Sequence, residues 1–127
     1  MSKYTVITGD IINSKDHENI INNLSKKIAD IDYPNNNLTP FAISRGDEIQ
    51  TVFEGKIELP QFLRRVRYKL KPLEIRFGIG YGKVEGDFNN SNSWNMSGSA
   101  FYNAREALNN INKNDDLKTM FISNNKI

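Results

Sequence analysis

The order in which two hydrophobic periods alternate along the chain constrains the fold more than any other feature. Short apolar runs predict strands at residues 4–8, 41–44, 49–53, 73–84 and 117–122. Apolar residues at helical spacing predict helices over residues 16–32, 59–70 and 98–111, with a loop at 34–40. This order, β-α-β-β-α-β followed by α-β, predicts an α+β fold of the ferredoxin-like, split βαβ kind with an extra C-terminal helix and strand.

That topology also predicts which parts of the chain meet. Right-handed crossovers place the first and third predicted strands side by side and antiparallel at the centre of the sheet. The end of the first strand then faces the start of the third. Asp10 follows the first strand and Asp47 precedes the third, so we expect both carboxylates to come within reach of one ion.

Each of these acids stands beside a flexible glycine where a strand is predicted to end, in the motifs Gly9-Asp10-Ile11 and Arg45-Gly46-Asp47-Glu48-Ile49. Mg²⁺ prefers oxygen ligands and usually takes one or two carboxylates together with substrate phosphates. We therefore predict Mg²⁺, or Mn²⁺, on Asp10 and Asp47, with the Ile11 carbonyl as a further ligand and Glu48 assisting. Spacing alone also fits ordinary turn acids, and the topology favours the metal site.

The turn after Asp10 is a predicted phosphate site. Backbone N–H groups at the start of a helix attract anions. The turn formed by Ile12, Asn13, Ser14 and Lys15 could therefore seat the phosphates of the same ligand. The alternative is a plain helix cap, in which Ser14 or Asp16 bonds the first turn.

Composition narrows the function classes further. At 127 residues the chain fits one domain. It has no cysteine and a single histidine, His17, which excludes thiol chemistry, disulfides, histidine-rich metal sites and a serine-histidine triad within one chain. A formal charge of +2 disfavours a nucleic-acid or anionic-membrane partner. No apolar run approaches the ~20 residues that span a bilayer, so we expect a cytoplasmic protein.

Three further features have more than one interpretation. Gly78, Gly80 and Gly82 do not fit the dinucleotide fingerprint, and they predict either close backbone or ligand approach or a bulge. The basic run at residues 64–71 is more typical of a solvated helix face than of a nucleic-acid patch. Trp94 could stack on a base, pack in the core or contact a second copy.

The chain resembles the SatD family in four blocks that occur in the same order. They are ITGDIINSK at residues 7–15, SRGDE at 44–48, IRFGIGYG at 75–82 and GSAFYNARE at 98–106. More distantly, the same blocks are similar to the catalytic domain of class III nucleotidyl cyclases and to the palm domain of GGDEF diguanylate cyclases.

The more distant resemblance implies roles for several residues. Asp10 and Asp47 match the metal-binding aspartates, and Arg45 and Gly46 stand in the nucleotide-binding hairpin turn. Asn95 falls where adenylyl cyclases place a base-reading aspartate. Other positions depart from the pattern: Phe41 replaces the adenine-selecting lysine, Tyr102 replaces the transition-state asparagine, and Arg105 lies one position before the transition-state arginine.

These observations predict a Mg²⁺-dependent nucleotide-binding protein. Its reaction would convert ATP or GTP to a cyclic nucleotide or small oligonucleotide with release of pyrophosphate. The resemblance also implies a homodimer, because related cyclases assemble their sites between two subunits. The alternatives are a sensor or regulatory module that binds a nucleotide or a partner protein without turnover, and a nucleic-acid-binding domain.

Overall fold

The computed structural model describes residues 3–12, 14–44, 47–86, 93–112 and 119–123. Its strands are β1 (Tyr4–Ile12), β2 (Asn37–Ser44), β3 (Glu48–Glu54), β4 (Glu74–Gly82) and β5 (Thr119–Ser123). Its α-helices are α1 (Glu18–Ile21), α2 (Leu24–Ala29), α3 (Leu59–Lys69) and α4 (Ser99–Asn112). Two short 3₁₀ helices, η1 (Ser14–His17) and η2 (Ser93–Asn95), complete the described elements.

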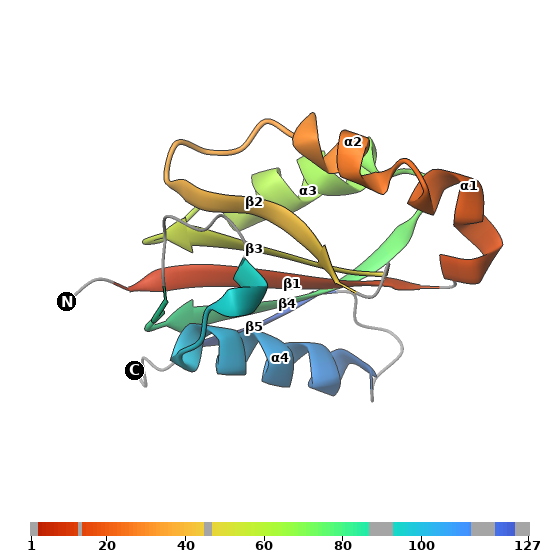
Figure 1. Cartoon of the computed structure of the whole chain (residues 1–127). Coiled ribbons are helices and arrows are strands. Elements are labelled where there is room, and N and C mark those ends of the chain that lie inside the picture. The colour runs from red at the N-terminus through yellow and green to blue at the C-terminus, as the bar shows by residue number, and fades with distance from the viewer. Residues whose placement is uncertain (1–2, 13, 45–46, 87–92, 113–118, 124–127) are drawn as a thin grey trace.

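The strands form one mixed sheet in the order β2-β3-β1-β4-β5. The first four pair antiparallel with one another, and β5 runs parallel to β4. Helices α1, α2 and α3 cover one face, whereas α4 covers the other (Figure 1). The predicted α+β class is confirmed, as is the predicted antiparallel contact between the first and third strands at the sheet centre.

Strand β1 is longer than predicted. It continues through Gly9 and Asp10 to Ile12, so the prediction that the strand stops at Gly9 is wrong. Gly9 is needed for packing instead of for a turn. A Cβ at this position would lie 2.9 Å from Phe77 and 3.1 Å from Ile49 and Ile75, closer than side chains normally approach.

The first predicted helix is broken into short pieces. Residues 14–17 are 3₁₀, and α1 and α2 are separated at Asn22 and Asn23. Leu24 and Ile28 are the buried residues of α2, whereas α1 buries none. Little packing therefore holds the first turns in a single helix, and asparagine has a low helix propensity. Neither predicted cap forms, because His17 is the N-cap residue of α1 and makes no side-chain cap bond.

Strand β2 begins at Asn37, inside the segment predicted to be a loop. It contains Pro40, which lacks the N–H that an inner strand needs. The strand lies at the sheet edge, and its pairing with β3 shifts register between Asn37 and Thr39 and again between Thr39 and Ala42. An edge position with bulges is where a proline is tolerated.

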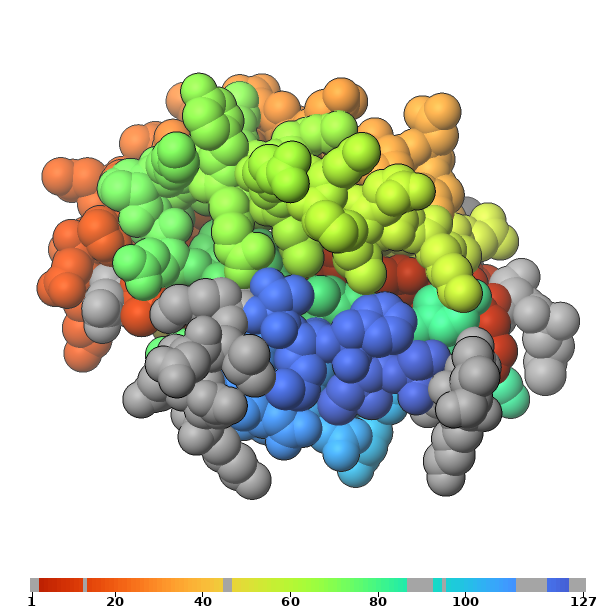
Figure 2. Space-filling model, turned by 180° about the vertical axis from the view of Figure 1, so that it is seen from behind, coloured from red at the N-terminus to blue at the C-terminus, as the bar shows by residue number. Residues whose placement is uncertain are grey.

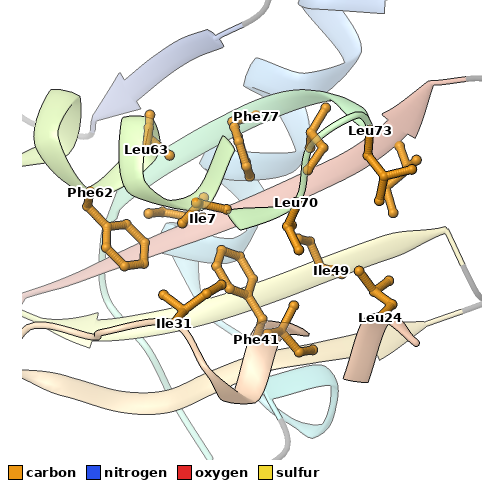
Figure 3. Close-up of a cluster of buried hydrophobic side chains, with 14 of the residues drawn as sticks. Ile7, Leu24, Ile31, Phe41, Ile49, Phe62, Leu63, Leu70, Leu73 and Phe77 are labelled. Atoms are coloured by element: carbon orange, nitrogen blue, oxygen red, sulfur yellow. The ribbon is translucent and has the colours of Figure 1, made fainter. Parts of the chain in front are cut away.

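The larger apolar core lies between the sheet and helices α2 and α3 (Figure 3). Phe41 of β2 and Phe53 of β3 meet Phe62 of α3, with the Phe53 and Phe62 rings 5.2 Å apart in an edge-to-face arrangement, and Phe77 of β4 meets Phe41. Such ring pairs add to the stability that burial supplies. This face contributes most of the apolar burial.

Helix α4 packs against the opposite face through two glycines of β4. A Cβ at Gly78 would overlap the backbone of Ala104 and Leu108, and one at Gly80 would overlap the backbone of Ala100 and Ala104. The register between β1 and β4 is unbroken along this stretch. The alternate glycines therefore serve close backbone approach, which is one of the two predicted interpretations, and not a bulge.

Most of the basic run lies on α3, next to β5 on the surface seen in Figure 2, and Lys71 follows the end of the helix. Its members do not form a uniform patch. Arg67 turns inward, donates to the Ile75 carbonyl (3.2 Å) and the Thr119 hydroxyl (2.9 Å), and lies over the Phe77 ring. Burial lowers the pKa of Arg67 from its usual value. None of the helices in the described ranges is both long and apolar enough to span a membrane.

Candidate functional site

A row of charged side chains crosses three strands on the α4 face. In the sheet register Asp10 of β1 lies directly opposite Glu48 of β3 on one side and Arg76 of β4 on the other. Directly opposite residues on neighbouring strands project from the same face of a sheet. Arg105 of α4 reaches the row from above. Two acids and two arginines therefore share this end of the face.

The arginines pair unequally with the acids. Arg105 holds Glu48 in a bidentate ion pair, with distances of 3.0 Å from Nη2 to Oε1 and 3.3 Å from Nη1 to Oε2. Arg76 approaches Asp10 only to 3.9 Å. The Asp10 carboxylate is thus the less engaged of the two, and about a quarter of its side-chain surface stays accessible.

The electrostatic environment of Asp10 opposes ionisation. Partial burial raises the pKa of Asp10, and the negative charges of Glu48 and Asp47 raise it further. Arg76 and Arg105 act in the opposite direction without cancelling the effect. Close carboxylates that shift a pKa upward are typical of sites that accept a cation or a proton.

Asp47 lies at the end of the ladder between β1 and β3. The Ile11 N–H donates to the Asp47 carbonyl at 2.9 Å, which extends the pairing one residue beyond β3. In an extended strand the N–H and C=O of one residue point to the same side, so the Ile11 carbonyl also faces the Asp47 side. The sequence thus correctly placed Asp10, Ile11 and Asp47 at one end of the sheet. The residue directly opposite Asp10 is Glu48, however, and not Asp47.

The predicted phosphate turn has a different structure. Ile12 belongs to β1 and pairs with Glu74, while Ser14 and Lys15 lie in the four-residue η1. No regular α-helix therefore starts directly after Asp10, and the predicted row of free helix N–H groups is wrong for Ile12. Asn13, Arg45 and Gly46 lie outside the described residues, and the Asn95 side chain does as well.

No group of three potential metal-ligating side chains occurs close together within the described ranges. The acids at this end of the sheet are therefore fewer, or farther apart, than those of a preformed all-protein metal cage. Mg²⁺ normally retains waters and takes one or two carboxylates plus phosphate oxygens, so a smaller protein ligand set still fits that ion.

A pocket of about 340 Å³ adjoins the charged row, and sequence reasoning missed it. It is lined by Gln50, Ser93, Trp94, Met96, Ser97, Gly98, Phe101, Tyr102 and Arg105. Gln50 donates to the Thr8 hydroxyl at 3.0 Å. The sequence did hold a signal for Gln50: it lies two residues from Glu48 in a predicted strand, so both side chains must project from the same face of the sheet.

The segment that forms the outer wall of this pocket is fixed to the sheet. The Ser93 hydroxyl donates to the Gln50 carbonyl at 3.3 Å, and the Trp94 indole N–H donates to the Ala42 carbonyl at 3.0 Å. Ser97 forms a two-way backbone bridge with Glu85. The half-buried Trp94 is therefore part of the pocket wall and does not belong to either apolar core. Base stacking and contact with a second copy remain as its interpretations.

Together, the fold and the site define an α+β domain with a carboxylate-rich end of the sheet beside a small pocket. A family model describes the chain over residues 4–126 as SatD. The chain therefore belongs to the SatD family. A comparison with curated proteins finds no match.

Proposed function

We propose that this protein binds a nucleoside triphosphate, ATP or GTP, together with Mg²⁺ or Mn²⁺ at the carboxylate-rich end of the α4 face. The observation that carries the proposal is the direct opposition of Asp10 and Glu48, with Asp47 close enough to raise the pKa of Asp10. Like charges placed opposite each other destabilise a sheet. A bound cation would relieve that repulsion.

The strand arrangement supports the same proposal. The order β2-β3-β1-β4 with antiparallel pairing agrees with the order expected for a ferredoxin-like sheet with α4 and β5 added. The palm of nucleotidyl cyclases shares this plan, and the proposed relationship rests on strand order and on the position of the acids.

The donor set fits a magnesium ion. Asp10, Asp47 and the Ile11 carbonyl offer hard oxygen ligands at the end of one ladder, and Glu48 would support them. When bound, such an ion neutralises phosphate charge and can activate an attacking hydroxyl. The reaction would be transfer of the nucleotidyl group to a hydroxyl with release of pyrophosphate. A homodimer would supply further groups to the site.

The decisive experiment incubates the purified protein with each of the four triphosphates and Mg²⁺ or Mn²⁺, and resolves the products by chromatography and mass spectrometry. We expect pyrophosphate and a cyclic or oligomeric product from ATP or GTP. Asp47→Asn should abolish turnover. The exposed Asp32 supplies a matched control, since Asp32→Asn should leave turnover unchanged. Equal turnover by both variants would overturn the metal assignment.

A second candidate function is binding without turnover, as in a sensor. The bidentate Arg105–Glu48 ion pair favours it, because an arginine engaged with an acid is not positioned to stabilise charge on a phosphate. Metal-dependent binding of ATP or GTP in equilibrium dialysis, with no product formed, would establish this function. The same binding should weaken at least about tenfold in Asp10→Asn.

A further inference from the structure

We propose that the pocket beside the charged row binds the base of the nucleotide and that Gln50 accepts a hydrogen bond from an amino group on that base. This inference rests on the proposed function and deepens it, because it assigns a second subsite and a base preference. The pocket lies on the same face as the acids, and Arg105 belongs to both.

The distance between the two subsites suits a nucleotide. Gln50 and Glu48 are two residues apart on β3, and a strand advances ~3.4 Å per residue. The pocket floor is therefore about 7 Å from the carboxylates. This separation allows a base to occupy the pocket while its phosphates reach the acids through the sugar.

The walls have the chemistry of a base-binding site. Trp94, Met96 and Phe101 present apolar or aromatic surface, and Tyr102 stands at the rim, about 73% exposed. Pockets of a few hundred Å³ with apolar walls and few polar groups are typical of small-molecule sites. A flat heteroaromatic ring matches this combination better than a sugar or an aliphatic chain does.

Gln50 supplies the specific polar group. It is only 5% exposed, and its Nε2 is satisfied by the Thr8 hydroxyl. Its Oε1 is buried and has no hydrogen-bond partner within the parts of the chain that the structure describes. Leaving a buried acceptor unpaired is unfavourable. Gln50 lines the pocket, so a ligand seated there with an N–H donor would satisfy this atom once the amide group turns toward the pocket.

Three other hollows among the described residues lack this combination, and one of them, of about 400 Å³, is lined mainly by α2 and β2. A groove of about 580 Å³ lies between α3 and Thr119 of β5, and another of about 700 Å³ lies between α3 and residues 32–36. Both are larger, but neither is lined by Asp10, Glu48 or another member of the charged row. Among these hollows of the described residues, the smaller pocket is therefore the one that adjoins the proposed phosphate and metal site.

Nucleosides without phosphates test this inference in the absence of metal. Trp94 is the single tryptophan of the chain and lines the pocket, so its fluorescence reports occupancy directly. The titrations compare adenosine with purine riboside, guanosine with inosine, and cytidine with uridine, in buffer containing EDTA and with correction for ligand absorption. We expect the amino-bearing member of at least one pair to bind roughly two- to tenfold more tightly, which is the effect of one hydrogen bond.

Two substitutions assign that preference to Gln50. Gln50→Met keeps the side-chain length but removes the acceptor, so it should abolish the difference within the pair. Gln50→Glu keeps an acceptor and should preserve it. Thr39→Val, which alters another buried polar residue outside the pocket, is the matched control and should behave like the unsubstituted protein.

The outcomes separate this inference from the proposed function. Absence of Trp94 quenching by all six nucleosides, equal affinities within every pair, or a preference that survives Gln50→Met would overturn the inference. If the triphosphate with Mg²⁺ binds no more tightly than the nucleoside alone, the base subsite is supported and the metal-dependent function is contradicted.

Discussion

The two faces of the sheet come from the same strands but bury different chemistry. On the face toward α2 and α3, strands β1 to β4 contribute large apolar side chains, and phenylalanine rings meet at its centre. On the α4 face, β1 changes from Val6 through Thr8 to Asp10, from buried and apolar to partly exposed and charged. One face thus forms a continuous core, whereas the other changes along β1 from apolar to charged.

This difference teaches how a small domain can carry strained polar groups. Opposed acids and an unpaired buried acceptor both reduce stability. They are tolerated where a separate core supplies the free energy of folding. Substitutions on the two faces should therefore change the free energy of unfolding by different amounts and in different directions, which makes the comparison testable.

The largest expected effect belongs to the α3 face. Phe53 is fully buried and packs edge-to-face on Phe62. Phe53→Ala should lower the free energy of unfolding by about 3–5 kcal/mol, because it removes apolar burial and leaves a cavity. Urea unfolding followed by circular dichroism measures this loss. Phe121, about half exposed on β5, provides the control, and Phe121→Ala should cost far less.

An intermediate effect compares a glycine from each face. Gly78→Ala places a methyl group against the backbone of α4, which cannot move without shifting the helix, and should cost about 1–3 kcal/mol. Gly9→Ala meets only side-chain atoms of the apolar core, which can shift by a few tenths of an ångström. Its loss in the same urea experiment should be smaller. The reverse order would show that the core is the less adaptable face.

The smallest effect is a gain at the charged row. Asp10→Asn removes a charge opposite Glu48 and should raise stability at neutral pH by roughly 0.2–1 kcal/mol. The folded-state pKa of Asp10 is raised above 3.8. The stability of the unsubstituted protein therefore falls as pH rises from 3.8 to the folded-state pKa, because the folded protein binds more protons than the unfolded chain in this interval. The difference between the two proteins should therefore vanish below pH 3.8.

Urea titrations at several pH values across this interval measure the difference in unfolding free energy between the two proteins, with Asp32→Asn as an exposed control. A variant that is less stable than the parent at neutral pH would mean that attraction by Arg76 and Arg105 outweighs the repulsion.

The sequence was informative wherever local periodicity decides structure. The strands, α3 and α4 follow their apolar periods, and pairing by strand order brings Asp10 and Asp47 to one end of the sheet. Errors arose where distant residues decide. Gly9 indicates a turn by residue type, but its conformation is set by packing against Phe77. The pocket at Gln50 depends on a segment more than forty residues later in the chain, which no local pattern reveals.

The glycines under α4 also control how the helix meets the charged row. With no side chain at Gly78 or Gly80, the helix lies lower over β4 than it could over branched residues. From that height the Arg105 guanidinium extends across the width of β1 to Glu48. The two glycines of β4 thus set the distance of α4 from the sheet, and this distance decides whether Arg105 can reach Glu48. A change in the Arg105–Glu48 distance would therefore report a change in the distance between the helix and the sheet.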